Sequence, residues 1–237
     1  MRRVIAIGGT DPSGGAGLTR DAAMAARMGC EVKPVVTAVT VQTDTGVDAL
    51  NPVPPSVVRA QLQAALAVPM PAAIKIGMVA TEAQVAALAE LLPQDLPLVF
   101  DPVLRASSGG TLSAAPALRP LIARSTLLTP NLPEAACLSD LPEAAYADAL
   151  QAQARALLAL GAGAVLIKGG HARGDHCVDH LFTPQGTEQF AAPRVAAGKR
   201  GTGCSLATAI ACRLAAGTDL AAACRSAKAE LTRWLRL

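Results

Sequence analysis

The chain has 237 residues, 51% of them hydrophobic and 16% charged, a balance that allows a sizeable core and excludes intrinsic disorder. Its formal net charge of +3 comes from lysines and arginines scattered along the chain, and aromatic residues make up only 2%. We therefore expect no nucleic-acid partner, because nucleic-acid binding needs basic clusters and aromatic stacking platforms.

The cysteines and the N-terminal segment bear on location. The six cysteines form no CxxC pair and no zinc-ligand spacing, which is typical of a reducing compartment. The opening "MRRVIAIGGTD" has an apolar run too short for the core of a signal peptide. The longest uncharged stretch, Ala60–Ile74, contains two prolines and two glutamines, so we expect no membrane span. These features predict a cytoplasmic protein without membrane contact.

Short β-branched runs alternate with alanine-rich stretches along the chain, a pattern typical of strands followed by helices. The predicted strands are Val4–Ile7, Pro34–Val41, Ala73–Ile76, Leu98–Phe100, Thr126–Leu128 and Ala164–Ile167. The predicted helices are Leu18–Met28, Pro55–Ala67, Glu82–Leu91, Pro116–Ala123, Glu134–Leu138, Glu143–Leu160, Cys204–Ala215 and Leu220–Leu235. Because the strands read as unbroken apolar runs, we expect parallel strands that helices cover on both faces. The predicted fold class is α/β, a doubly wound three-layer α/β/α sandwich.

One region breaks the alternation. Between Val178 and Val195 the sequence "VDHLFTPQGTEQFAAPRV" places turn residues, Pro184 to Gly186, between two short apolar runs. This pattern predicts an antiparallel hairpin at one edge of the sheet. Since no repeat, low-complexity segment or linker divides the chain, we expect one domain over residues 1–237.

Unusual polar and glycine-rich segments follow the predicted strands. In chain order these segments are "GGTDPSGGAG", Gln42, "GM", "DPV", "TPNLPE" and "KGGH". In open α/β sheets, ligands bind beyond the carboxyl ends of the strands. The sequence therefore predicts a ligand site at this edge of the sheet.

A further motif, "GKRGTGCSLATAIA", places Cys204 in the first turn of a predicted buried helix. The first amide groups of a helix lack intrahelical partners and attract anions. A thiol in that position ionises more readily than a free one, with a pKa that can fall to roughly 3.5–7.5. Phosphate chemistry assisted by a thiolate is one interpretation. A small buried cysteine after a glycine turn is the other.

The first glycine-rich loop does not match either common nucleotide motif. No lysine closes the loop as a P-loop requires, and the dinucleotide pattern GxGxxG is absent. Its glycines would allow close backbone approach to a small polar substrate, although an ordinary strand-to-helix turn has the same composition.

Seven motifs together resemble the hydroxymethylpyrimidine/phosphomethylpyrimidine kinases of thiamin biosynthesis, within the ribokinase-like superfamily. They span Ile5 to about Ile210, in the family's order: "GGTDPSGGAGLTRD", "VVTAVTVQTDTGV", "IKIGMVAT", "DPV", "LLTPNLPEA", "VLIKGGH" and "GTGCSLATAIA". The resemblance implies a ribokinase-like fold and a homodimer. It also implies transfer of the γ-phosphoryl group of ATP to a pyrimidine alcohol and then to its monophosphate, with Mg²⁺.

The resemblance assigns the phosphate side of the site residue by residue. The backbone amides of Gly201, Thr202, Gly203 and Cys204 would form the anion hole, with Cys204 as the base. Lys168 would reach the ATP phosphates, and Asn131 and Lys228, with Thr202 and Gly203, would contact the nucleotide. Asp101 and Glu134 would share Mg²⁺ with waters and phosphate oxygens, although Glu134 also suits a helix cap.

On the substrate side, the resemblance points to Gly9, Ala16, Asp21, Gln42 and Met78. The amide of Gln42 can donate and accept hydrogen bonds at once, which suits the edge of an aminopyrimidine. Asp21, placed in the first turn of its helix, would bond the exocyclic amine, although an acid there also suits the helix dipole. Met78 also suits the core, and His171 is interpreted as structural.

The sequence departs from the family pattern in two places. The flap after "DPV" reads "LRASSGGTLS", with Ser107 and Gly110 where the family usually has a lysine and an aspartate, and Arg105 could compensate for the lost charge. The sequence also stops at Leu237, where relatives commonly continue. Two alternatives stay open: a pyridoxal kinase on the same scaffold, and a non-catalytic pyrimidine-binding regulator.

Overall fold

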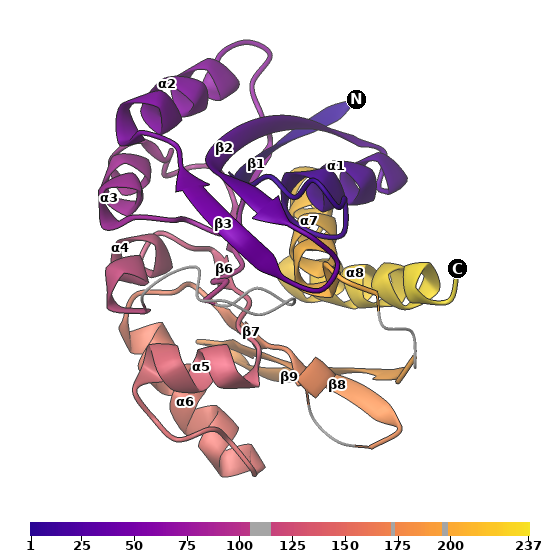
Figure 1. Ribbon diagram of the computed structural model, residues 1–237. Coiled ribbons are helices and arrows are strands. Elements are labelled where there is room, and N and C mark those ends of the chain that lie inside the picture. The colour runs from indigo at the N-terminus through magenta and orange to yellow at the C-terminus, as the bar shows by residue number, and fades with distance from the viewer. Residues whose placement is uncertain (105–114, 172–173, 196–198) are drawn as a thin grey trace.

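The computed structural model describes residues 1–104, 115–171, 174–195 and 199–237 (Figure 1). Its strands are β1 (Arg2–Gly9), β2 (Cys30–Gln42), β3 (Val47–Pro52), β4 (Ala73–Ile76), β5 (Leu98–Phe100), β6 (Leu127–Leu128), β7 (Val165–Ile167), β8 (His176–Thr183) and β9 (Gly186–Pro193). Its α-helices are α1 (Gly17–Arg27), α2 (Pro55–Leu66), α3 (Glu82–Leu91), α4 (Arg119–Ile122), α5 (Leu132–Ser139), α6 (Ala147–Ala159), α7 (Thr202–Ala215) and α8 (Leu220–Leu235). Two short 3₁₀ helices are η1 (Ala115–Leu118) and η2 (Gly169–His171).

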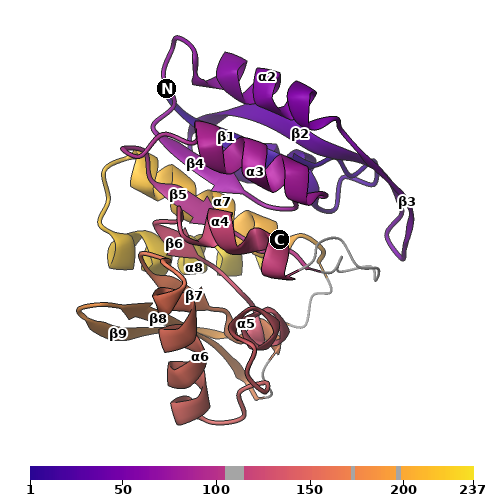
Figure 2. The ribbon, with the colours of Figure 1, turned by 90° about the vertical axis from the view of Figure 1, so that its left-hand side faces the viewer.

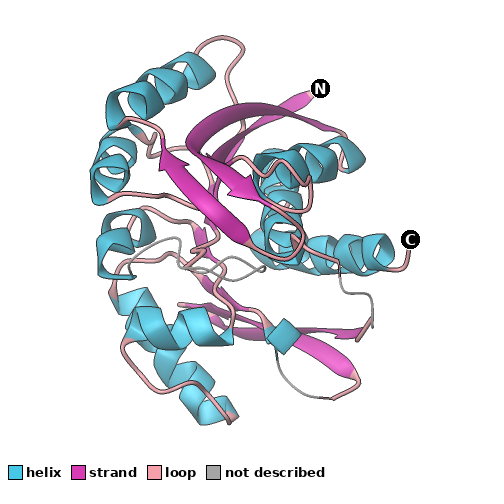
Figure 3. Cartoon of the chain, in the orientation of Figure 1, coloured by secondary structure: helices cyan, strands magenta, loops and turns pink. Residues whose placement is uncertain are grey.

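The strands form one sheet in the order β3-β2-β1-β4-β5-β6-β7-β8-β9 (Figure 3). The central strands, from β2 to β7, pair in parallel. Antiparallel strands close both edges: β3 pairs with β2 at one end, and β8 and β9 extend the other end from β7. The predicted α/β sandwich and the predicted hairpin near residues 178–195 are confirmed.

Helices cover both faces of the sheet (Figures 1 and 2). One core cluster contains residues of α2, α3, α4, α5 and α6 packed against strand residues such as Ile74 and Ile76. The other contains residues of α1, α7 and α8 packed against Val4, Ala73 and Val99. Successive strand residues point to opposite faces, so strands buried on both faces carry apolar residues at every position. This burial explains the unbroken apolar runs of the sequence.

The strand β3 at one edge was not predicted from the sequence. Its residues, "VDALNP", are exposed or half-buried, and they include an aspartate, an asparagine and a proline, which are depleted in strands. Backbone pairing with β2, from Ala38 opposite Pro52 to Gln42 opposite Val47, holds this strand in place. An edge strand stabilised in this way leaves little hydrophobic signal in the sequence.

Several predicted helices have different bounds in the structure, among them α7, which begins at Thr202 rather than at Cys204. The helix predicted over Pro116–Ala123 consists of η1 followed by the short α4, and its two prolines cannot donate backbone hydrogen bonds. The helix predicted from Glu143 begins only at Ala147, while α5 begins two residues before the predicted Glu134. Within the described ranges, no helix combines the length and the apolar character that crossing a bilayer requires.

Candidate active site

A cleft of about 1040 Å³ lies beyond the carboxyl ends of the parallel strands. The segments that follow β1, β2, β4, β5, β6 and β7 line it together with the start of α7. The predicted site residues among its lining are Gly9, Ala16, Gln42, Met78, Asp101, Asn131, Glu134, Lys168, Gly201, Thr202, Gly203, Cys204 and Lys228. The strand-end motifs, distant in sequence, therefore meet in one place.

Asp21 is the predicted substrate-binding residue that does not line this cleft. Its side chain is 0% exposed and lies in the second turn of α1, which begins at Gly17, so the expected first-turn position is wrong. Both carboxylate oxygens accept hydrogen bonds from Lys75 Nζ, at 2.9 and 2.8 Å. Thr208 Oγ1, from α7, donates to the same carboxylate at 2.8 Å. With no exposed surface, Asp21 has no direct route to a ligand amine in this structure.

Lys75 is a cleft residue that the sequence reasoning missed. It lies in the middle of β4, "AIKI", with 1% of its surface exposed, and it lines the cleft. Gly77 leaves room for it, because a Cβ atom there would lie 2.8 Å from Lys75 Nζ. A lysine within an otherwise apolar strand is a usable signal, since a buried ammonium needs a partner charge.

The loop between β1 and α1 is held in shape by Asp11. Its carboxylate accepts hydrogen bonds from the backbone N–H and hydroxyl of Ser13 and from the N–H of Ala16. Gly17 has a positive φ of 57°, and a Cβ atom there would lie only 2.4 Å from the carbonyl oxygen of Gly9. The loop therefore needs glycine at this position to curve around the cleft.

Arg200 joins three segments at the cleft. Its guanidinium contacts Asp11 and Asp44 at 3.2 Å each and donates to the hydroxyl of Ser13 at 2.6 Å. Asp44 belongs to the turn between β2 and β3, whereas Arg200 directly precedes the GTG motif. One side chain thus connects the first loop, the β2–β3 turn and the start of α7.

The start of α7 presents backbone amides to the cleft. Gly201, its N-cap, has φ 71° and makes no side-chain cap to the helix. A Cβ atom on Gly201 would lie 2.3 Å from the carbonyl oxygen of Gly15, and one on Gly203 would lie 3.2 Å from Asp101 Oδ2. The glycines of the GTG motif therefore allow close packing, and the uncapped amides remain suited to an anion.

Cys204 lines the cleft and is half-buried. Burial raises the pKa of its thiol to about 11, against the opposing effects of the Lys75 charge and the Gly17 N–H, which donates to the sulfur. The expectation of a lowered thiol pKa is therefore wrong. Loss of solvation outweighs the favourable effects of the Lys75 charge and the Gly17 N–H, because burial disfavours the negatively charged form.

Asp101, Lys168 and Glu134 form a charged cluster beside the start of α7, where a Cβ atom on Gly203 would lie 3.3 Å from Lys168 Nζ. Lys168 Nζ lies 2.6 Å from Asp101 Oδ1 and 3.8 Å from Glu134 Oε2. Burial raises the pKa of Glu134, while the Lys168 charge acts to lower it. Among the described residues, no group of three or more His, Cys, Asp and Glu side chains is arranged to hold a metal. The two carboxylates still fit Mg²⁺, which commonly takes one or two carboxylates with phosphate oxygens and waters.

Glu134 also has the helix-capping role that the sequence left open. Its carboxylate accepts the N–H of Asn131 at 2.8 Å, and the Asn131 side chain accepts the N–H of Glu134 at 2.8 Å. This reciprocal pair is a capping box that fixes the start of α5. The same contact orients both residues at the rim of the cleft, so capping and a role toward nucleotide or metal are compatible.

Lys228 and the flap complete the predicted set. Lys228, from α8, lines the cleft and its ammonium lies 2.7 Å from Asp179 of β8, whose other carboxylate oxygen accepts the N–H of Gly169. The flap residues Arg105, Ser107 and Gly110 lie outside the described residues, as does the side chain of His171.

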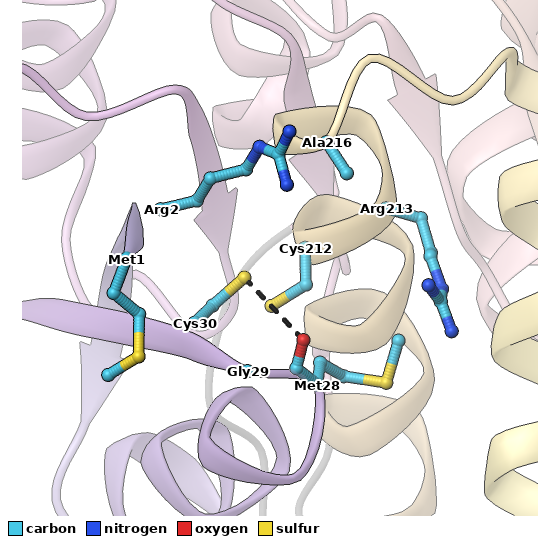
Figure 4. Close-up of a pocket in the computed structure, with 8 residues that line it drawn as sticks. All are labelled: Met1, Arg2, Met28, Gly29, Cys30, Cys212, Arg213 and Ala216. Carbon is cyan, nitrogen blue, oxygen red and sulfur yellow. Dashed lines mark hydrogen bonds between the residues drawn. The ribbon is translucent and has the colours of Figure 1, made fainter.

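A second, smaller cavity of about 500 Å³ lies where β1 and β2 begin and α7 ends (Figure 4). Cys30 and Cys212 lie beside each other there, next to Arg2 and Arg213 (Figure 4). Burial raises the pKa of the Cys212 thiol, and the nearby Cys30 adds to the effect. The two thiols lie at the opposite end of the strands from the polar motifs.

Comparisons with known proteins match this arrangement. The profile of the family described as phosphomethylpyrimidine kinase matches residues 11–236. A relative from Escherichia coli, named hydroxymethylpyrimidine/phosphomethylpyrimidine kinase, is 40% identical over 241 residues, covering 98% of this chain and 91% of the relative. One of the same name from Mycobacterium tuberculosis is 41% identical over 243 residues, covering 99% and 88%.

Two solved structures resemble the fold closely. The phosphomethylpyrimidine kinase of Clostridium difficile 630 is 30% identical, with a TM-score of 0.85, covering 99% of this chain and 100% of the other. The pyridoxal kinase of Staphylococcus aureus in complex with AMP-PCP and pyridoxal is 30% identical, with a TM-score of 0.87, covering 98% and 87%. The sequence relatives and the family profile span nearly the whole chain, cleft included, and on these grounds the chain belongs to the phosphomethylpyrimidine kinase family.

Proposed function

We propose that the chain transfers the γ-phosphoryl group of ATP to 4-amino-5-hydroxymethyl-2-methylpyrimidine and then to its monophosphate, in thiamin biosynthesis. Membership of a kinase family supports this function, as do the names of its relatives. The observation that carries it is the meeting of uncapped α7 amides, Lys168 and Gln42 in one cleft. Phosphoryl transfer depends mainly on alignment and charge stabilisation, and this cleft offers donors for both ends of the reaction.

The phosphate end is built around α7. The amides of Gly201 to Cys204 would hold the migrating phosphoryl group, because no side chain caps them and the helix dipole favours negative charge there. Lys168, whose side chain is 13% exposed, would contact the ATP phosphates from its position beside the start of α7. Asn131 and Lys228 would line the nucleotide side.

Mg²⁺ belongs to the proposal, with Asp101 and Glu134 as the residues that would hold it. Bound there, it would neutralise charge on the phosphate oxygens. Asp101 also accepts a hydrogen bond from Thr129 at 3.2 Å, which fixes the carboxylate at the carboxyl end of β5. Lys168 donates a hydrogen bond to the same carboxylate at 2.6 Å.

The pyrimidine end is built around Gln42, whose amide could pair with the ring edge of the substrate. Gly9 leaves space for Met78, since a Cβ atom on Gly9 would lie 2.5 Å from Met78 Cε. Ala16 and Gly9 would form the wall of the ring site. Cys204, at the junction of the two ends, would accept the proton of the substrate hydroxyl.

A kinetic comparison of acceptors tests the proposed substrate. ADP release is measured with the pyrimidine alcohol, with its monophosphate and with pyridoxal, each over a range of concentrations. We expect kcat/KM to be highest for the pyrimidine acceptors. Higher kcat/KM for pyridoxal would favour the second candidate, a pyridoxal kinase, which the likeness to the Staphylococcus aureus enzyme supports. Pyrimidine binding without ADP release would identify a non-catalytic regulator.

The proposal extends to assembly and location. We propose a homodimer of one-domain chains: Val39 and Val41 of β2 are 50% and 48% exposed, and such valines suit a contact between copies. Light scattering after gel filtration would measure the mass directly. A cytoplasmic location is consistent with all six cysteines being free thiols.

A further inference from the structure

A lysine, an aspartate and a threonine from three different elements meet beneath the cleft. Lys75 comes from β4, Asp21 from α1 and Thr208 from α7, and their exposed fractions are 1%, 0% and 0%. The Lys75 ammonium donates two hydrogen bonds to the Asp21 carboxylate, which also accepts one from Thr208. Burying such a pair costs considerable desolvation energy, and an apolar pair would often serve stability equally well. Stability alone therefore does not explain why the charges are there.

The position of the ammonium suggests what it does. Lys75 and Cys204 line the same cleft, and Thr208 lies one helical turn after Cys204, so the two α7 residues share a face of that helix. An ammonium has three N–H groups. Within the described residues, its hydrogen bonds both go to Asp21, which leaves one N–H for the cleft side.

We propose that Lys75, held in place by Asp21 and Thr208, is a positioning residue. Its positive charge stabilises the thiolate that forms when Cys204 loses its proton. The inference rests on the proposed role of Cys204 as the base. In this step the S–H bond breaks, the proton leaves to water and the sulfur keeps the electron pair. The thiolate then accepts the proton of the substrate hydroxyl as the new O–P bond forms, while the bond from the γ-phosphorus to the bridging oxygen of ATP breaks and ADP leaves with that electron pair.

Among the charged groups around Cys204, Lys75 is the one that most favours the thiolate. Asp21 and Asp101 oppose a negative sulfur, and burial opposes it most strongly. Lys75 is the strongest of the groups that favour the thiolate, ahead of the Gly17 N–H. Lys168 also lies within electrostatic range of the sulfur, but its hydrogen bond and ion pairs go to Asp101 and Glu134. Neutralising Lys75 should therefore affect Cys204 more than removing any other nearby side chain.

Alkylation of Cys204 by iodoacetamide tests the inference without nucleotide or substrate. Rates are resolved by peptide mass spectrometry between pH 6.5 and 9.5, and Cys177, which is also half-buried and lines the same cleft, is the internal control. Well below the thiol pKa, the rate follows the thiolate fraction, tenfold per pKa unit. In Lys75→Met we expect Cys204 alkylation at pH 8 to slow by about tenfold or more, and Cys177 to be unchanged.

A second variant separates the charge effect from folding. Lys75→Met leaves the Asp21 charge buried and unpaired, whereas Asp21→Asn with Lys75→Met removes both charges and keeps an acceptor for Thr208. We expect this double variant to recover the Tm of the wild type. We expect its Cys204 alkylation rate to lie between those of the wild type and the single variant, with kcat still about tenfold or more below the wild type.

The outcomes separate the two claims. Identical Cys204 alkylation profiles in the wild type and both variants would overturn the inference, as would full recovery of kcat in the double variant. If Lys75→Met does not fold, the double variant alone decides. Full turnover by Cys204→Ala would refute the proposed role of Cys204 as the base. The alkylation rates do not test that role, so the two claims can fail separately.

Discussion

Two lysine–aspartate pairs lie close to the start of α7, and their lysines differ in exposure to solvent. Lys168 and Asp101 meet at 2.6 Å at the cleft surface, with Lys168 13% exposed and Glu134 as a second neighbour. Lys75 and Asp21 meet at 2.8 Å with side chains 1% and 0% exposed. The open pair can exchange partners when phosphate arrives, whereas the sealed pair keeps its geometry throughout. The difference fits our two proposals, that Lys168 and Asp101 contact ligands and that Lys75 stabilises the Cys204 thiolate.

The largest expected effect comes from replacing Cys204. Cys204→Ala should lower kcat by about 10²–10⁴-fold, the range that general acid–base catalysis contributes, while ATP affinity changes little. Turnover is measured by ADP release, and ATP affinity by isothermal titration. Cys177→Ala is the matched control, because that thiol lines the cleft away from α7. An unchanged kcat in Cys204→Ala would show that the sulfur takes no part in the mechanism. The buried Lys75–Asp21 pair would then have no catalytic group to act on.

The two lysines should differ in their effect on folding. Lys75→Met should lower the free energy of unfolding by about 3–5 kcal/mol, because it leaves a buried carboxylate without its partner. Lys168→Met should lower it by less, because the Lys168 side chain is 13% exposed whereas that of Lys75 is 1% exposed, but it should weaken ATP binding. Urea denaturation of both variants measures the first quantity and nucleotide titration the second. Equal losses of stability would show that the pairs are not distinct.

The pH profile sharpens the comparison further. A base with a thiol pKa of about 11 is mostly protonated at neutral pH, so its active fraction rises about tenfold for each pH unit below that value. We expect log kcat/KM to rise with a slope near 1 between pH 7 and 9, measured under conditions in which the chemical step limits the rate. In Cys204→Ala this rise should be absent. A flat profile in the wild type would mean that ligand binding, rather than Lys75, brings the thiol to its active form.

A smaller effect is expected from the first loop. Gly17→Ala forces a side chain into a positive φ and toward the Gly9 carbonyl, whereas Gly29→Ala meets the same φ penalty with no neighbour within 4 Å. Both changes should cost about 1 kcal/mol from the backbone conformation, and Gly17→Ala should also raise KM for the pyrimidine. Thermal unfolding and acceptor kinetics distinguish the two contributions. Similar KM values in the two variants would show that the shape of the loop is not needed for binding.

The features that could be predicted are those encoded in short stretches of the sequence, whereas features that depend on contacts between distant residues could not. The parallel strands and the polar segments after them are written in short runs, so their meeting at one edge follows from the fold class. The strand β3 is held by backbone pairing with β2 and leaves almost no hydrophobic pattern. The Lys75–Asp21 contact joins residues 54 positions apart, and no local rule pairs them. The raised pKa of Cys204 has the same origin, because the burial that causes it comes from tertiary packing.

The bridge made by Arg200 has a consequence for the order of events at the cleft. One guanidinium contacts the loop between β1 and α1, where we propose that the pyrimidine binds, and the turn beyond β2, and it belongs to the peptide that leads into α7. Tightening one end of the cleft therefore transmits strain to the other, and each ligand should alter the affinity for its co-substrate by the same factor. With such coupling, the cleft should reach its reactive arrangement only when both substrates are bound.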